Sequence, residues 1–266
     1  MNHIIILAGG KGTRMKTERP KVLNTIKEVS FIKKVLNSVT RICHCPTIIV
    51  GYKGDEVISE TGNKYHYVLQ KEQLGTGHAI MCAKNDLASR DIDTILVLNG
   101  DHPLVKAKTL KNIICSHKKG WAVLTVASIV VSNFEGDLNM FSDFGKIIRG
   151  ENGEIKGIVE IKDATEKEKE VKEVNVSYYC FDAKWLWSNI EKIVNKNKAG
   201  EYYLTDLVKM AFNENQKINS YIIKNPIEGM GVNTAEHLMV AEKCCKIPLE
   251  DFIARKFAFL SKIFLS

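Results

Sequence analysis

Three glycines and three cations stand close together near the start of the chain. The run Leu7–Met15 reads Leu-Ala-Gly-Gly-Lys-Gly-Thr-Arg-Met, and Lys21 follows soon after it. Glycines let a backbone approach a ligand without a Cβ in the way, and their N–H groups can point together at an anion. Lys11, Arg14 and Lys21 add positive charge. The segment predicts a polyphosphate-binding loop, because a plain turn would need fewer glycines and no cations.

Two common phosphate-binding motifs do not fit this loop. The pattern GxxxxGK[ST] is absent, and GxGxxG fails because Met15 stands where the third glycine is required. No helical pattern begins directly after Gly12. The loop therefore belongs to another kind of nucleotide site.

Polar side chains also follow two later strand-like runs. Gln70 comes after the run 65–69, and Asn99-Gly100-Asp101 comes after the run 93–98. Ligands of parallel sheets bind at the carboxyl ends of the strands. A carboxylate at Asp101 suits Mg²⁺, and the amide of Gln70 offers both a donor and an acceptor. The alternatives are a helix-capping Asp101 and a buried structural Gln70.

The elements that must position these side chains alternate between strand and helix patterns. Strands are predicted at 3–8, 47–52, 65–70 and 93–98, and helices at 31–42, with Ser30 as N-cap, 55–60 and 78–87. Such alternation predicts βαβ units and a parallel sheet. His78 is expected to be a helix-start residue without a catalytic role.

After Trp121 the pattern changes. We expect strands at 121–131, 174–181 and 218–224, a hairpin at 146–161 that turns at 151–154, a solvated segment at 165–173, and helices at 185–194, 235–246 and 249–264. The prediction is an α/β, Rossmann-like domain with a mixed, mostly parallel sheet, helices on both faces and an inserted antiparallel section. Residues 1–233 form this domain, and 234–266 form C-terminal helices.

Composition favours a cytoplasmic protein that binds small phosphorylated molecules. The 266 residues are 45% hydrophobic and carry a net charge of +7, but Lys and Arg are spread along the chain without a basic run. Nucleic acid and membranes are therefore not expected partners. The 7 Cys form no CxxC pair, so we expect unbridged thiols and no structural zinc. No signal peptide or membrane-spanning run is recognised.

Leu7–Met15 with Pro20-Lys21 resembles the signature loop of the sugar-nucleotide pyrophosphorylases. These enzymes transfer a nucleotidyl group from a nucleoside triphosphate to a sugar 1-phosphate and release pyrophosphate. Four further segments make residues 2–246 similar to the uridyltransferase domain of the bacterial bifunctional N-acetylglucosamine-1-phosphate uridyltransferases: Gln70–Ala79, Asn99–Leu104, Glu201–Asp206 and Gly231–Thr234.

The resemblance implies UTP and N-acetylglucosamine 1-phosphate as substrates, with Mg²⁺ as cofactor. Its implied catalytic residues are Arg14, Lys21 and Asp101. The implied metal ligands are Asp101 and Asn233. Nucleotide binding is implied for Leu7, Ala8, Gly9, Gly10, Gln70, Gly75, Thr76, Asn99 and Gly100. Sugar binding is implied for Gly145, Glu160 and Asn175, although Val176-Ser177 stands where the family usually has Thr-Gly or a small residue after that Asn.

The mechanism implied by the family is in-line attack of the sugar phosphate on the α-phosphorus of UTP. A phosphate monoester has a second pKa of about 6, so it is largely ionised at neutral pH and needs no general base. Two alternatives stay open. The protein could use another base or hexose 1-phosphate, or it could be a non-catalytic module that binds nucleotide sugars.

The family's second domain, a left-handed β-helix built on hexapeptide repeats, has no counterpart in these 266 residues. We therefore expect no acetyltransferase activity from them. The tail 247–264 is rich in apolar residues. It is expected to pack on the domain or to form a homo-oligomer contact, with a membrane-surface helix as the alternative.

Overall fold

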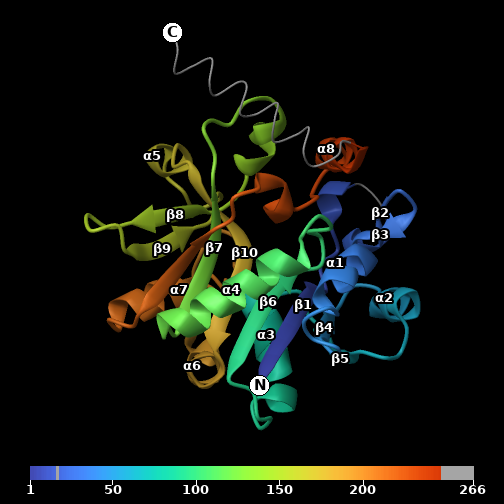
Figure 1. Cartoon of the computed structure of the whole chain (residues 1–266), viewed down its shortest axis with the longest axis horizontal. Coiled ribbons are helices and arrows are strands. Elements are labelled where there is room, and N and C mark those ends of the chain that lie inside the picture. Colours follow the sequence, from blue (N-terminus) through green and yellow to red (C-terminus); the bar gives the residue numbers. More distant parts are fainter. Residues whose placement is uncertain (16–17, 247–266) are drawn as a thin grey trace.

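The computed structural model describes residues 1–15 and 18–246. Its main sheet has the strand order β11-β7-β10-β6-β1-β4-β5 (Figure 1). The strands are β1 (Asn2–Ala8), β4 (Thr47–Val50), β5 (His66–Leu69), β6 (Thr94–Asn99), β7 (Leu124–Val130), β10 (Glu173–Asp182) and β11 (Ile218–Ile222). Along this order β10 runs antiparallel to both its neighbours, and the other pairs are parallel. The predicted mixed, mostly parallel sheet is confirmed.

The central strands are apolar on both faces because helices cover both sides. Ile4, Ile5 and Ile6 of β1 are fully buried. Ile4 and Ile6 enter one hydrophobic core, and Ile5 enters the other. A near-continuous run of β-branched residues is typical of such doubly covered strands.

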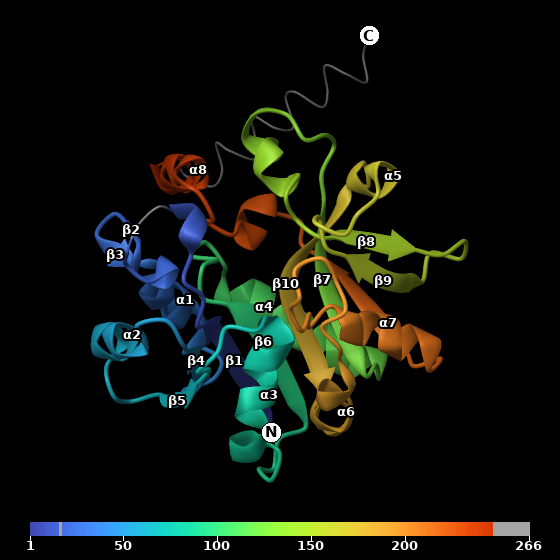
Figure 2. The ribbon, with the colours of Figure 1, turned by 180° about the vertical axis from the view of Figure 1, so that it is seen from behind.

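The helices lie on the two faces of the sheet, as predicted. The first core contains apolar side chains of α1 (Phe31–Val39), α2 (Gly54–Thr61) and α4 (Ala107–Gly120). The second contains those of α3 (Thr76–Leu87), α6 (Ala183–Asn189) and α7 (Asp206–Asn213). Figure 1 shows α4 in front of the sheet, and Figure 2, from behind, shows α3 and α6.

Two local predictions need correction. Helix α4 was not predicted, although Leu110, Ile113, Ile114 and His117 fall at helical spacing on its buried face. Ser30 does stand at the N-cap position of α1, but its side chain makes no capping hydrogen bond.

The inserted antiparallel section is a hairpin that branches from β10. Strands β8 (Lys146–Arg149) and β9 (Ile155–Val159) pair with each other, and Lys146 of β8 pairs with Val174 of β10. The predicted turn at 151–154 connects them. The charged stretch that follows contains the short α5 (Glu166–Lys169), none of whose residues is buried.

Helix α8 (Ala235–Lys246) packs on the same domain. Its Ala241 is buried in the first core, and Lys243 pairs with Asp137 at 2.9 Å. The predicted helix at 249–264 lies outside the described residues.

None of the helices that the structure describes is long and apolar enough to cross a membrane. All seven cysteines are described, and none of them forms a disulfide bond.

The topology brings distant segments to one edge of the sheet. Strands β1, β4, β5 and β6 are parallel, so the residues that follow them meet at their shared carboxyl edge. Because β10 runs in the opposite direction, its first residues, including Asn175, reach the same edge. The fold therefore explains why the polar residues predicted after separate strands lie close together.

Candidate active site

Two adjoining cavities open at this edge of the sheet. Their volumes are about 280 and 270 Å³, and they share wall residues Leu7, Thr76, Asn99, Asp101 and Glu201. Together they form one cleft with two halves. Asp101 lies where the halves meet.

The first half contains eight of the nine residues predicted to bind nucleotide: Leu7, Ala8, Gly9, Gly10, Gln70, Gly75, Thr76 and Asn99. Gly100 lines neither cavity. Its N–H donates to the Leu7 carbonyl at 2.8 Å, and a Cβ there would lie 3.1 Å from Val22. Gly100 thus packs behind the cleft and lines neither cavity.

The loop glycines have different structural roles. A Cβ at Gly9 would lie 2.9 Å from Gln70 Oε1, whereas a Cβ at Gly10 would meet nothing within 4 Å. Gly12 has φ +69°, and a Cβ there would collide with the Lys21 side chain. Gly9 therefore lets the loop approach Gln70, and Gly12 leaves room for Lys21. Lys11 lies 5.3 Å from the Tyr52 ring and lines neither cavity, contrary to its expected place beside the phosphates.

Segments 70–79 and 201–206 lock together through Gly75. Gly77 N–H donates to the Tyr202 carbonyl, and Tyr202 N–H donates to the Leu74 carbonyl, each at 2.8 Å. Gly75 has φ +111°, and a Cβ there would lie 2.6 Å from the Tyr202 carbonyl oxygen. The wall of the first cavity therefore depends on a glycine at this position.

We expect Gly75→Ala to destabilise the protein by about 3 kcal/mol or more, because backbone strain and a clash with backbone atoms add together. Gly200→Ala is the matched control. Gly200 has φ +66° with nothing within 4 Å of its Cβ position, so it should cost only about 1 kcal/mol. Urea unfolding of both variants measures the difference. Equal losses would mean that the contact with Tyr202 is unimportant.

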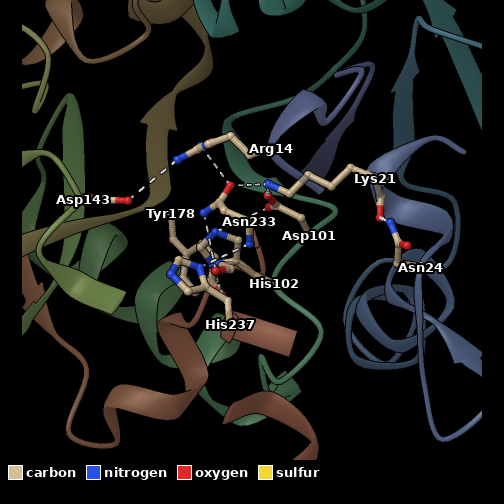
Figure 3. Close-up of polar contacts among 10 residues, drawn as sticks. Arg14, Lys21, Asn24, Asp101, His102, Asp143, Tyr178, Asn233 and His237 are labelled. Atoms are coloured by element: carbon tan, nitrogen blue, oxygen red, sulfur yellow. Dashed lines mark hydrogen bonds and ion pairs between the residues drawn. The ribbon is translucent and has the colours of Figure 1, made fainter. Parts of the chain in front are cut away.

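Lys21, Asp101 and Asn233 converge where the two cavities join (Figure 3). The Lys21 ammonium contacts both Asp101 Oδ2 and Asn233 Oδ1. Arg14 donates to the same Asn233 oxygen at 3.1 Å. Asn233 reaches Asp101 because the Val232 N–H donates to the Asp101 carbonyl at 2.9 Å. The predicted catalytic and metal-binding residues are thus brought together from four segments of the chain.

The Asp101 carboxylate is held in its charged form. Burial by itself would raise its pKa, but the Lys21 ammonium beside it and neighbouring His102 lower the pKa below the ordinary value. Asp101 Oδ1 is buried and has no hydrogen-bond partner among residues 1–15 and 18–246. This oxygen is therefore available to a further cation.

The oxygen atoms of Asp101 and Asn233 suit a hard divalent ion. They already share one cation, the Lys21 ammonium, and Mg²⁺ is typically bound by one or two carboxylates together with substrate phosphates. The described part of the chain contains no cluster of three or more His, Cys, Asp or Glu residues that could hold a metal. The donors therefore fit Mg²⁺ bound together with phosphate better than a closed, all-protein metal site.

His102 is a site residue that the sequence analysis did not single out. Its Nε2 lies 3.6 Å from Asp101 Oδ1, and its Nδ1 lies 3.1 Å from the Tyr178 hydroxyl. Tyr178 donates its proton to the Glu228 carbonyl at 2.7 Å, so His102 Nδ1–H must donate to Tyr178. Burial lowers the pKa of His102 to about 4. The imidazole is thus neutral at pH 7 and braces the Asp101 loop.

The second half of the cleft contains the three residues predicted to bind sugar. Asn175 N–H donates to the Gly145 carbonyl at 2.8 Å, and a Cβ at Gly145 would lie 3.3 Å from Glu160 Oε2. The Asn175 amide donates to the Tyr179 hydroxyl at 2.6 Å. Thr205 donates to Glu160 Oε1 at 3.1 Å. Gly145, Glu160 and Asn175 therefore form one continuous wall.

Ser177 stands in this wall with an unusual backbone conformation. Its φ is +56°, in the left-handed region that glycine adopts most easily, and it lies in the irregular stretch of β10 between Asn175 and Tyr179. Its N–H donates to Asn175 Oδ1 at 3.0 Å, which holds the turn. Ser177 therefore adopts a glycine-like conformation and lines the second cavity.

Comparisons with known proteins show the family of this chain. Residues 4–142 match the family model described as the MobA-like NTP transferase domain. The chain belongs to the MobA-like NTP transferase family. The bifunctional protein GlmU of Clostridium novyi is 38% identical over 249 residues, which are 93% of this chain and 53% of that protein. GlmU of Streptococcus mutans is 39% identical over 243 residues, 91% of this chain and 51% of that protein.

A solved structure shares the fold of this NTP transferase. It is a putative glucose-1-phosphate thymidylyltransferase from Bacillus anthracis in complex with a sucrose, with a TM-score of 0.70, 20% sequence identity, and 92% and 95% of the two chains covered. This likeness supports the nucleotidyltransferase fold alone. The chain spans about half the length of the two GlmU proteins it matches.

In this NTP transferase the carboxyl group of Glu160 lies among other acidic side chains in the second half of the cleft. Burial raises the pKa of Glu160, and Asp206, Asp163 and Glu201 nearby raise it further, while Thr205 opposes the shift. A raised folded-state pKa means that the stability Glu160 contributes is present at low pH and lost as pH rises through that pKa. Its neutral isostere Gln avoids this loss.

We therefore expect Glu160→Gln to gain stability relative to the unchanged protein as pH rises through the raised pKa of Glu160. For the sugar phosphate that the family resemblance implies as substrate, it should also raise KM about 10-fold or more, because a carboxyl oxygen that could accept hydrogen bonds from the sugar is replaced. Glu151→Gln, at the exposed tip of the same hairpin, is the control. Thermal unfolding at several pH values and steady-state kinetics measure both effects. An unchanged KM would mean that Glu160 does not contact the sugar phosphate.

Proposed function

We propose that this chain transfers the uridylyl group of UTP to N-acetylglucosamine 1-phosphate, with Mg²⁺, and releases pyrophosphate. The observation that supports this most strongly is the position of Lys21, Asp101 and Asn233 at the junction of the two cavities. A nucleotide in the first half and a sugar phosphate in the second would bring their phosphates together there. The GlmU relatives and the resemblance of residues 2–246 to uridyltransferase domains support the choice of substrates.

In the proposed complex the first half of the cleft holds UTP. The loop at Gly9 and Gly10 turns its backbone toward the phosphates, and the buried amide of Gln70 faces the base. In the second half, Glu160 accepts hydrogen bonds from sugar hydroxyls, and Asn175 contacts the acetamido group. These assignments agree with the division of the residues between the two cavities.

The proposed reaction requires the protein mainly to position the two substrates and to compensate their negative charge. The ionised sugar phosphate attacks the α-phosphorus, the bond to the bridging oxygen breaks, and pyrophosphate leaves. Lys21 and Arg14 donate to phosphate oxygens and hold the two polyanions together. Mg²⁺ on Asp101 and Asn233 would supply further positive charge. Burial lowers the pKa of His102 to about 4, so its ring is a weak base, which agrees with a reaction that needs no general base.

A substrate panel tests the proposal. Purified protein is mixed with UTP, CTP, GTP, dTTP or ATP, each with N-acetylglucosamine, glucosamine or glucose 1-phosphate and Mg²⁺, and pyrophosphate release is measured. UTP with N-acetylglucosamine 1-phosphate should give the highest kcat/KM. Preference for another pair would replace the proposed substrates, and no release from any pair would favour a binding module.

A further inference from the structure

The side-chain amide of Gln70 is held in one orientation by two acceptors. Its Nε2 lies 3.0 Å from the Gly75 carbonyl oxygen and 3.2 Å from His78 Nδ1. A carbonyl oxygen can only accept, so the nitrogen of the amide must face Gly75. Gln70 Oε1 consequently points the other way, toward Gly9, where a Cβ would lie 2.9 Å from it. The oxygen is thus the atom of the Gln70 amide left for a ligand of the first cavity, which Gln70 and Gly9 both line.

The contact with Gln70 also defines the tautomer of His78. Since Gln70 Nε2 donates to Nδ1, that nitrogen carries no proton, and the ring N–H is on Nε2. That nitrogen lies 3.9 Å from the sulfur of Cys82, one turn later on α3. The ring also lies beside Tyr202, with 6.3 Å between ring centroids. His78 is therefore held by its own helix and by segment 201–206.

From this geometry we infer that His78 is a positioning residue for base selection. By accepting from Gln70 Nε2, it keeps Gln70 Oε1 facing the base, where this oxygen accepts the N3–H of uracil. Cytosine has a lone pair at N3 instead, and two acceptors that face each other without a proton would be left unpaired. The arrangement thus favours UTP over CTP. The inference rests on the proposed function, since it assumes that the first cavity holds a pyrimidine nucleotide.

A residue that only begins a helix would not need to accept a hydrogen bond from Gln70. An aliphatic residue would preserve the start of α3 but leave one amide hydrogen of Gln70 without its acceptor, so only the Gly75 carbonyl would hold the amide and its orientation would be fixed less strictly. An Asn can place its Oδ1 where the His Nδ1 accepts. The variants His78→Leu and His78→Asn therefore separate loss of the acceptor from loss of the imidazole ring.

The test compares UTP and CTP binding in the full chain by isothermal titration calorimetry with Mg²⁺, without sugar phosphate. The unchanged protein should bind UTP more tightly. His78→Leu should reduce the UTP-to-CTP affinity ratio about 10-fold, as expected for one lost hydrogen bond of about 1.4 kcal/mol, and His78→Asn should largely restore it. Cys82→Ala, which removes only the contact on the far side of the ring, should leave the ratio unchanged.

In kinetic assays the same loss should raise the KM of UTP and change kcat little, because base contacts are made equally in the ground and transition states. If His78→Leu is folded by circular dichroism and keeps the full preference for UTP, the inference is wrong while the proposed function stands. If His78→Asn binds like His78→Leu, the acceptor is not what matters, and the inference also fails. If the unchanged protein binds neither nucleotide, the proposed function fails and the inference fails with it.

Discussion

Asp101→Asn is expected to reduce uridylyl transfer on the order of 1,000-fold, because one substitution removes a negative charge at the proposed Mg²⁺ site and weakens the hold on Lys21. Asp101 is the residue that both halves of the cleft share at the convergence of Lys21 and Asn233. The Asn side chain has nearly the same shape, so the fold should be retained.

Two readouts distinguish a lost metal site from a lost fold. Electron paramagnetic resonance of Mn²⁺ with UTP should show weaker binding of Mn²⁺ to the variant. Circular dichroism should remain that of the unchanged protein. The matched control is Asp137→Asn, at an exposed ion pair with Lys243, which should alter neither turnover nor Mn²⁺ binding. Near-normal turnover by Asp101→Asn would disprove its assignment as a metal ligand.

Lys21→Met is expected to lower kcat/KM on the order of 100-fold, since it removes a preorganised positive charge at the proposed reaction centre. Met keeps much of the apolar stem, so the space beside Gly12 remains filled. The loss should exceed that in the affinity for UTP alone, because charge develops on the bridging oxygen only as its bond breaks. Kinetics with both substrates varied, together with calorimetric binding of UTP, measure the two effects.

Lys11→Met provides a matched control for Lys21→Met within the same loop. Lys11 points to the Tyr52 ring and lines neither cavity, so its replacement should have a much smaller effect. If both lysine variants lost the same activity, a general positive potential would explain the loop better than a specific contact by Lys21.

The sequence predicted those site residues that follow strands. Gln70 and Asp101 each come directly after a buried apolar run, and parallel strands bring such positions to one edge. The loop at Gly9 could be recognised by composition alone. Local patterns also predicted much of the fold. Periodicity and turn residues were enough to predict the mixed sheet, the helices on both faces and the hairpin at 146–161.

Other parts of the site depend on tertiary contacts that no local pattern contains. Asn233 precedes a helix and would be read as an N-cap; its place beside Asp101 comes from the backbone hydrogen bond of Val232. The ring of His102 is oriented by a hydrogen bond to Tyr178, which lies far along the chain. Gly100 shows the opposite case, where a motif position is used for packing.

Helix α4 was missed for a different physical reason. Its lysines and polar residues reduce the overall hydrophobicity of 107–120, although its buried residues keep helical spacing. Ser177 could not have been predicted to adopt a left-handed conformation, because a non-glycine residue is rarely found there.

The central claim is that the cleft joins the α-phosphate of UTP to a sugar phosphate. Its most direct test is incubation with UTP labelled at the α-phosphorus, N-acetylglucosamine 1-phosphate and Mg²⁺, followed by separation of the products. The label should appear in a nucleotide sugar, only when the sugar phosphate is present, while unlabelled pyrophosphate is released. Label that stays in UTP, or moves to UMP whether or not the sugar phosphate is added, would contradict the claim.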